Sequence, residues 1–157
     1  MSRVFICSDT HFGHENMARK RGFISSEEHD HAIITNWNKV VHKNDKVYVL
    51  GDLTMEKKNY AIFGKLNGTK VAILGNHDLE QDGEQLRQYF SKIAGCVKYK
   101  KKFWLTHIPI HPIELRGLKN CHGHCHENSI PDENYINVCM EMINYTPVLI
   151  ESFYEQG

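Results

Sequence analysis

The sequence predicts an α/β domain with a largely parallel sheet at its core, and two patterns along the chain carry this prediction. Apolar and β-branched runs at 3–8, 46–51 and 70–75 are nearly continuous, as expected for strands buried on both faces. Helical patterns lie between these runs, and such alternation is typical of parallel sheets. Later strands are expected at 101–107, 135–139 and 146–151, with fewer helices between them, which indicates a mixed or second sheet.

The clearest helical pattern covers residues 25–41. Ser25 and Glu28 have the spacing of a capping box, and apolar residues then follow at helical spacing on one face. That face consists of Ile33, Ile34, Trp37, Val40 and Val41. Two further helices are expected at about 56–66 and 82–92.

Composition limits the class of protein. A single domain is expected over residues 1–157, because the chain has no internal repeat, low-complexity tract or linker. The formal net charge of zero argues against a protein that coats nucleic acid or a membrane surface. Apolar runs stay well short of the roughly 20 residues that cross a bilayer. The five cysteines are scattered and no signal peptide precedes "RVFICS", so a cytoplasmic protein with reduced thiols is expected.

Residues that bind metals follow the ends of the predicted strands. They are Asp9 and His11, Asp52, then Asn76, His77 and Asp78, and finally His107. In open α/β sheets, ligands bind outside the carboxyl ends of the strands, where these side chains would converge. Each short motif alone is weak and is compatible with an ordinary turn. Their occurrence together, each at a strand end, favours a functional site.

The stretch "KNCHGHCHEN" places His122, His124 and His126 at every second position, with Cys121 and Cys125 between them. It admits three interpretations: a structural zinc clip, a histidine-rich surface, or one wall of a catalytic metal site. Alternate residues of an extended segment share one side. We therefore expect His124 and His126 to reach the same site, while Cys125 points away.

The zinc-clip interpretation requires four ligands, usually as two closely spaced pairs. Cys121 and Cys125 supply one pair, but Cys7 and Cys139 fall in apolar strand runs and Cys96 stands alone. The second pair is thus missing, and both cysteines of the stretch are expected to be small buried fillers.

The ordered set Asp-x-His, Gly-Asp, Gly-Asn-His-Asp, His and Gly-His-x-His resembles the calcineurin-like metallophosphoesterase superfamily from Asp9 to His126. The surrounding text "SDTHFGHENM", "NWNKVV", "VYVLGDL", "LTHIPIHP" and "NCHGHCH" further resembles its small bacterial and phage-type members. The resemblance implies a four-layer αββα sandwich with two mixed β-sheets. It also implies a dinuclear metal centre at the strand ends.

The resemblance further implies a ligand set for each metal. One metal would be held by Asp9, His11, Asp52 and His126, and the other by Asp52, Asn76, His107 and His124. A carboxylate such as that of Asp52 has two oxygens and can bridge cations that lie ~3.5–4 Å apart. Oxygen and nitrogen ligands without thiolate suit two divalent ions, with Mn²⁺ expected first and Fe, Zn²⁺, Ni²⁺ or Co²⁺ as alternatives. The family often has Gly-His where this chain has Thr106-His107, which leaves His111 as a competing ligand.

The implied reaction is hydrolysis of phosphate esters by a hydroxide that bridges the two metals. In the resembling family the residue at His77 stabilises or protonates the leaving oxygen, and the carboxylate at Asp78 orients its ring. His14 and Asn16 are candidate phosphate contacts, and Arg116 is a candidate for attracting an anionic substrate. Since a short chain leaves an open site, small or nucleotide-like phosphodiesters are the expected substrates, with nucleic-acid ends as a further candidate.

Two alternatives to a phosphodiesterase stay open. One is a phosphomonoesterase or protein phosphatase built on the same site. The other is a non-catalytic metal-binding scaffold of the same fold. His77 separates the scaffold from the enzyme, and its presence favours an enzyme.

Overall fold

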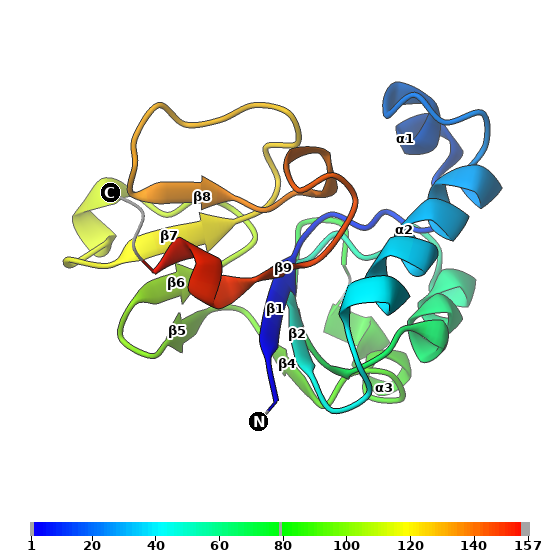
Figure 1. The fold of residues 1–157 in the computed structure, drawn as a ribbon, viewed down its shortest axis with the longest axis horizontal. Coiled ribbons are helices and arrows are strands. Elements are labelled where there is room, and N and C mark those ends of the chain that lie inside the picture. The colour runs from blue at the N-terminus through cyan, green and yellow to red at the C-terminus, as the bar shows by residue number, and fades with distance from the viewer. Residues whose placement is uncertain (1, 79, 155–157) are drawn as a thin grey trace.

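The computed structural model describes residues 2–78 and 80–154, which form two β-sheets packed face to face with helices outside them (Figure 1). The first sheet has the strand order β4-β3-β2-β1-β9. Its strands are β1 (Val4–Cys7), β2 (Lys46–Val49), β3 (Thr69–Ile73), β4 (Lys92–Ala94) and β9 (Val148–Leu149). The first four are parallel, and β9 runs antiparallel to β1.

The second sheet has the order β5-β6-β7-β8. Its strands are β5 (Val97–Tyr99), β6 (Phe103–Leu105), β7 (Lys119–His122) and β8 (Tyr135–Asn137). Strands β6, β7 and β8 are parallel, and β5 is antiparallel to β6. Both sheets are therefore mixed, as predicted.

Alternation along the strands builds two separate cores. In β1, Phe5 and Cys7 pack beneath the helices, whereas Ile6 packs between the sheets with Leu105 and Cys121 of the second sheet. Successive side chains of a strand point to opposite faces, so a run that is apolar at every position supplies both cores. The continuous apolar runs of the sequence have this physical origin.

Helices cover the outer face of the first sheet (Figure 1). They are α2 (Ser26–Val40), the 3₁₀ helix η1 (Lys57–Lys65) and α3 (Gly83–Leu86). Helix α1 (Glu15–Lys20) packs against α2, and the 3₁₀ helix η2 (Glu80–Asp82) leads into α3. The outer face of the second sheet is covered by η3 (Pro112–Glu114) and its flanking loops. There the Trp104 indole donates to the Leu115 carbonyl at 3.1 Å, and the Tyr135 hydroxyl donates to the Ile110 carbonyl at 2.7 Å. The predicted four-layer sandwich is thus present, with a thin fourth layer. The last elements are η4 (Met140–Met142) and η5 (Ile150–Phe153).

Helix α2 begins as the sequence indicates. The Ser25 hydroxyl accepts from the Glu28 amide at 3.2 Å, while the Glu28 carboxylate accepts from the Ile24 amide at 2.6 Å. Glu28 thus binds the amide before the N-cap rather than that of Ser25 itself. Ile33 and Trp37 are fully buried beneath the first sheet, as the helical spacing predicts.

Several elements differ from the prediction. The segment expected as a helix at 56–66 is the 3₁₀ helix η1, and only Gly83–Leu86 of the expected 82–92 helix is α-helical. The chain leaves that helix early because it must enter β4, where the Ser91 amide already donates to the Lys70 carbonyl at 2.8 Å. The elements α1, β4, β5 and β7 were not predicted as such. No helix in the described part of the chain is long and apolar enough to cross a membrane.

Candidate metal centre

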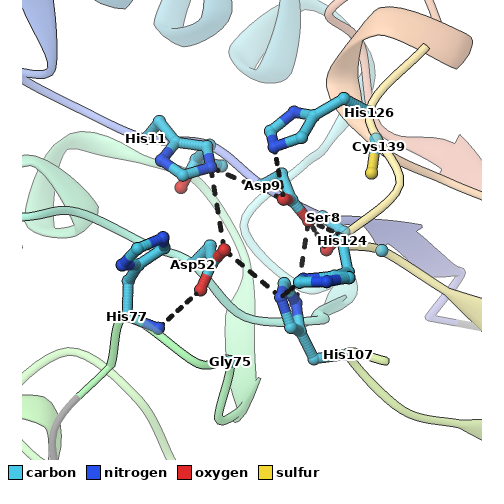
Figure 2. Close-up of polar contacts among 12 residues, drawn as sticks. Ser8, Asp9, His11, Asp52, Gly75, His77, His107, His124, His126 and Cys139 are labelled. Carbon is cyan, nitrogen blue, oxygen red and sulfur yellow. Dashed lines mark hydrogen bonds and ion pairs between the residues drawn. The ribbon is translucent and has the colours of Figure 1, made fainter. Parts of the chain in front are cut away.

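The candidate site lies where the carboxyl ends of five strands meet, across the boundary between the two sheets (Figure 2). From the first sheet come the residues that follow β1, β2 and β3, and from the second sheet those that follow β6 and β7. They are Asp9 and His11, Asp52, Asn76, His107, and His124 with His126. Parallel strands place their carboxyl ends at one edge, so residues far apart in sequence converge there.

One group of side chains consists of Asp9, His11 and His126, which can offer three ligand atoms to one cation. The His11 Nε2 atom lies 3.5 Å from Asp9 Oδ2, and His126 Nε2 lies 3.6 Å from the same oxygen. Two nitrogen or oxygen ligands of one metal are typically roughly 3 to 3.5 Å apart. Asp9 Oδ2 and both ring nitrogens of His11 are buried and have no hydrogen-bond partner among the described residues. A cation between them would satisfy Asp9 Oδ2 and His11 Nε2, the ring nitrogen that faces this oxygen.

A second group consists of Asp52, His107 and His124, with Asn76 beside them. His107 Nε2 lies 3.2 Å from Asp52 Oδ2 and 3.3 Å from His124 Nδ1. The Asn76 Oδ1 atom is 2.9 Å from His107 Nε2 and 3.0 Å from His124 Nδ1. The other ring nitrogen of His107 lies 2.7 Å from the Leu50 carbonyl, a hydrogen bond that leaves Nε2 free to bind a metal.

Asp52 lies between the two groups. Its Oδ2 atom is 3.8 Å from His11 Nε2 and 3.2 Å from His107 Nε2, so one oxygen faces both candidate positions (Figure 2). Its Oδ1 atom accepts from the His77 amide at 2.9 Å, which fixes the carboxylate. This is the geometry that a bridging ligand requires.

The carboxylates make the centre attractive to positive charge. Burial lowers the pKa of His107, but the hydrogen bond to Asp52 and the charge of Asp9 outweigh it and raise that pKa. Burial opposes ionisation of Asp52 as well, yet the hydrogen bond and charge of His107 hold its pKa below the usual range. Imidazolium and carboxylate thus stabilise each other at a place where a divalent cation would supply the positive charge instead.

Five of the candidate ligands have left-handed backbone conformations, which residues other than glycine rarely adopt. They are Asp9 (φ 59°), His11 (φ 44°), Asp52 (φ 50°), His124 (φ 69°) and His126 (φ 51°). The nearby glycines allow the loops to approach each other: a Cβ atom at Gly75 would collide with the Asp52 carboxylate, and one at Gly123 with the side chains of Ser8 and Asp9. Strain concentrated in this way is characteristic of functional sites.

His124 and His126 both reach the centre, but not for the reason that alternation suggests. Strand β7 ends at His122, and the chain beyond it forms a turn with both histidines in left-handed conformation. The turn delivers His124 to the Asp52 group and His126 to the Asp9 group. The alternative ligand His111 lies elsewhere, exposed at the start of η3, where its ring accepts from the Ile113 amide at 3.2 Å.

His77 lies with its ring beside the candidate metal centre and open to solvent. Its side chain is exposed and its ring centroid lies 6.2 Å from that of His11 (Figure 2). His14, at the N-cap of α1, lies on the same side, with its ring centroid 5.7 Å from that of His11. Burial, together with the charge of His11, lowers the pKa of His14 and favours its neutral form. The neutral ring can donate one hydrogen bond and accept another.

Asp78 has a different role from the expected one. Its Oδ2 atom accepts from the amides of Gly75 at 2.7 Å and Asp52 at 2.8 Å, and its Oδ1 atom accepts from the Leu53 amide at 3.0 Å. Both oxygens are thus bound to backbone, and the carboxylate ties the loop after β3 to the loop after β2. Asp78 therefore positions the ligand loops rather than the His77 ring.

The two remaining substrate candidates are less well placed. Arg116 precedes β7 and thus lies at the amino end of that strand, whereas the metal ligands follow its carboxyl end. Its exposed guanidinium lies 3.6 Å from Glu114, and its role in attracting an anionic substrate stays a prediction. Asn16 is exposed in the first turn of α1.

A buried network behind His126 was not predicted. The Glu141 carboxylate accepts from His126 Nδ1 at 2.8 Å and is held by Arg21 through two bonds of 3.0 Å. The Arg21 guanidinium also donates to the Asp9 carbonyl at 2.7 Å. Burial would raise the pKa of Glu141, but His126 and Arg21 lower it to about 2. A carboxylate behind a metal-binding histidine fixes its ring and raises its basicity.

We expect Glu141→Ala to weaken metal binding by about 10–100-fold, as is typical when the partner of a ligand histidine is lost. Competition with a metal-sensitive dye measures this affinity directly. Glu141→Gln, which retains an acceptor for His126, should show a smaller loss, and the exposed Glu133→Ala is the matched control. Equal metal affinity in Glu141→Ala and the control would contradict the assigned role.

We expect Cys125→Ser to change neither metal content nor activity, because Cys125 belongs to neither group of candidate ligands. Cys121 is fully buried as expected, whereas Cys125 is only half-buried. Elemental analysis of the purified variant tests this expectation. A large loss of bound metal would restore the zinc-clip interpretation.

Two mixed sheets with oxygen and nitrogen ligands gathered at their strand ends define a metallophosphoesterase. The family model of the calcineurin-like phosphoesterases matches residues 2–148, and the chain belongs to this family. As a member it is a metal-dependent phosphoesterase, and its two candidate ligand groups match the two divalent metals typical of the family.

Relatives cover the whole chain. The uncharacterized protein MJ1445 of Methanocaldococcus jannaschii is 37% identical, over 100% of this chain and 94% of its own length. The gene 66 protein of Mycobacterium phage D29 is 28% identical over 83% of this chain and 81% of its own. Among solved structures, the protein of unknown function AQ665 from Aquifex aeolicus has a TM-score of 0.76 and 27% identity, covering 97% of both chains. The predicted resemblance to small bacterial and phage-type members is thus confirmed.

Proposed function

We propose that this protein is a dinuclear phosphodiesterase that hydrolyses diesters with small or nucleotide-like substituents. The observation that carries the proposal is the position of Asp52, whose Oδ2 atom faces both groups of candidate ligands. Asp9, His11, Asp52 and His126 would hold one metal, and Asp52, Asn76, His107 and His124 the other. When bound, two such metals activate a water molecule and neutralise the charge that develops on the phosphoryl oxygens.

The residues of the chain that surround the metals have separate tasks. The backbone amides that donate to the Asp78 carboxylate hold the loops after β2 and β3 together, so that Asp52 and Asn76 keep their relative positions. His77 can donate a proton to the leaving oxygen, since its side chain is exposed beside His11 and its amide, not its ring, binds Asp52. His14 can donate a hydrogen bond to a phosphoryl oxygen from the same side.

The surroundings of the site favour a diester over a monoester. One cavity of about 580 Å³ borders the site at His126, and another of about 400 Å³ borders it at Asn76 and His107. A phosphate bound at the metals therefore has space for a substituent on either side. A phosphomonoesterase needs space for only one substituent on the phosphate. The exposed His77 favours an enzyme over a binding scaffold.

Manganese is the metal we propose first, with Fe, Zn²⁺, Ni²⁺ or Co²⁺ as alternatives, because the ligands combine carboxylate, amide and imidazole groups without thiolate. We also propose a cytoplasmic location. All five cysteines are free, as expected for a protein that works in a reducing compartment.

Metal analysis of the purified protein, followed by a panel of phosphate esters with Mn²⁺ added, tests this function. We expect two metals per chain and a higher kcat/KM on bis(p-nitrophenyl) phosphate than on p-nitrophenyl phosphate. A chelator should abolish the activity, and added Mn²⁺ should restore it. Preference for the monoester would contradict the diester assignment, and two bound metals without any hydrolysis would favour the scaffold.

A further inference from the structure

The cavity at His126 has walls from three segments that lie far apart in sequence. Helix α1 contributes Met17 and Lys20, the turn after β7 contributes Glu127 and Asn128, and the segment after η4 contributes Tyr145. Its volume of about 580 Å³ lies within the range of small-molecule sites. Because His126 belongs both to this cavity and to the Asp9 group, an occupant lies next to a phosphate held at the metals.

The floor of the cavity is polar but requires no charged ligand. Arg21 and Glu141, with side chains 1% and 12% exposed, form its inner wall and bind each other. The remaining guanidinium bonds of Arg21 go to the Asp9 carbonyl and to the His29 ring at 2.9 Å. The buried charges are thus balanced within the protein, and the floor of the cavity offers a second phosphate no unpaired cation among the described residues.

The side chains at the rim and along the sides of the cavity determine which kind of ligand it can bind. Lys20 and Glu127, of opposite charge, are exposed at the rim, and the exposed Asn128 offers an amide donor and acceptor. The Tyr145 ring and the Met17 thioether supply apolar surface. Tyr145 is held edge-to-face by Phe23, with ring centroids 5.2 Å apart. A flat aromatic ring with polar edges is more complementary to these side chains than an alkyl chain or an additional phosphate is.

We propose that this cavity binds the nucleoside of a nucleotide-like phosphodiester, with its base between Met17 and Tyr145 and its edge near Asn128. The inference rests on the proposed function, because it uses the metal centre to hold the attached phosphate. It goes further in placing one substituent of the diester on the His126 side and in naming it as a nucleoside. The cavity at Asn76 and His107 is left for the other substituent.

Binding to the Mn²⁺-loaded protein tests the cavity independently of turnover. The probes are inorganic phosphate and nucleoside 5′-monophosphates with purine and with pyrimidine bases, titrated by calorimetry. At least one nucleotide should bind about tenfold more tightly than phosphate, as expected for one stacked base. Met17→Trp, which fills the cavity, should remove this advantage and leave the affinity for phosphate unchanged.

Arg19→Trp is the matched control, since it places the same side chain on the exposed surface of the same helix, outside the cavity. Asn128→Ala should reduce the nucleotide affinity with little change in packing, because its side chain is exposed. The inference is overturned if every nucleotide binds no better than phosphate, or if Met17→Trp retains the advantage or weakens phosphate equally. Nucleotide selectivity without ester hydrolysis would contradict the proposed enzyme while supporting the cavity.

Discussion

Asp52→Asn is expected to lose both metals and to reduce phosphoesterase activity to the level of a protein-free control. The Asp52 Oδ2 atom lies near His11 Nε2 and near His107 Nε2, so weakening this one ligand affects both positions. An asparagine keeps the size of the side chain but removes its negative charge. Without that charge, two cations about 3.5–4 Å apart repel each other with less compensation.

Asp9→Asn and His124→Ala are the matched comparisons, because each belongs to only one group of candidate ligands. Elemental analysis should find that each retains more metal than Asp52→Asn does. Circular dichroism should show that all three variants keep the fold. If Asp52→Asn retains two metals and full activity, Asp52 is not the bridging ligand.

The ligands could be predicted from the sequence because their positions follow from the parallel strands. Asp9 and Asp52 each follow a continuous apolar run after a single intervening residue, and such runs form strands buried on both faces. Once β1 and β2 are known to be parallel, their carboxyl ends must lie at the same edge of the sheet. The convergence of these side chains then requires no knowledge of the loops.

Strand β7 could not be predicted in this way. Its residues Asn120 and His122 are polar, yet both are fully buried. Asn120 is accommodated because its amide donates to the Trp104 carbonyl and the Thr106 hydroxyl, both at 3.0 Å. A buried polar residue with local partners breaks the apolar pattern from which strands are recognised.

The partner of His126 was also beyond sequence reasoning. Arg21 and Glu141 are separated by 120 positions, and neither lies in a motif. Their pairing depends on the packing of α1 against the segment around η4, which no local pattern specifies. Similarly, the role of Asp78 becomes clear only when the backbone amides of two loops are placed around its carboxylate.

His77→Ala is expected to reduce kcat/KM by about 10²–10⁴-fold on a diester with an alkyl or ribose leaving group, the usual contribution of general acid catalysis. The alanine retains the backbone amide that donates to Asp52 Oδ1, so metal content should stay unchanged. Unchanged metal content would distinguish His77→Ala from substitutions of the metal ligands, which should lose activity together with metal. Elemental analysis of the same preparation provides the control.

The size of the loss should depend on the leaving group. An alkoxide is a poor leaving group and needs a proton as it departs, whereas nitrophenolate is already stabilised and gains little from one. The mutant-to-wild-type ratio of kcat/KM should therefore be much closer to one on a nitrophenyl ester than on an alkyl or ribose ester. A protonated His77 that only stabilises the phosphoryl oxygens would instead give similar ratios on both substrates. Equal ratios would exclude the general-acid role but leave the enzyme assignment in place. An unchanged rate on both substrates would exclude His77 from catalysis altogether, and hydrolysis would then depend on the metal centre without a proton donor from the exposed ring beside His11.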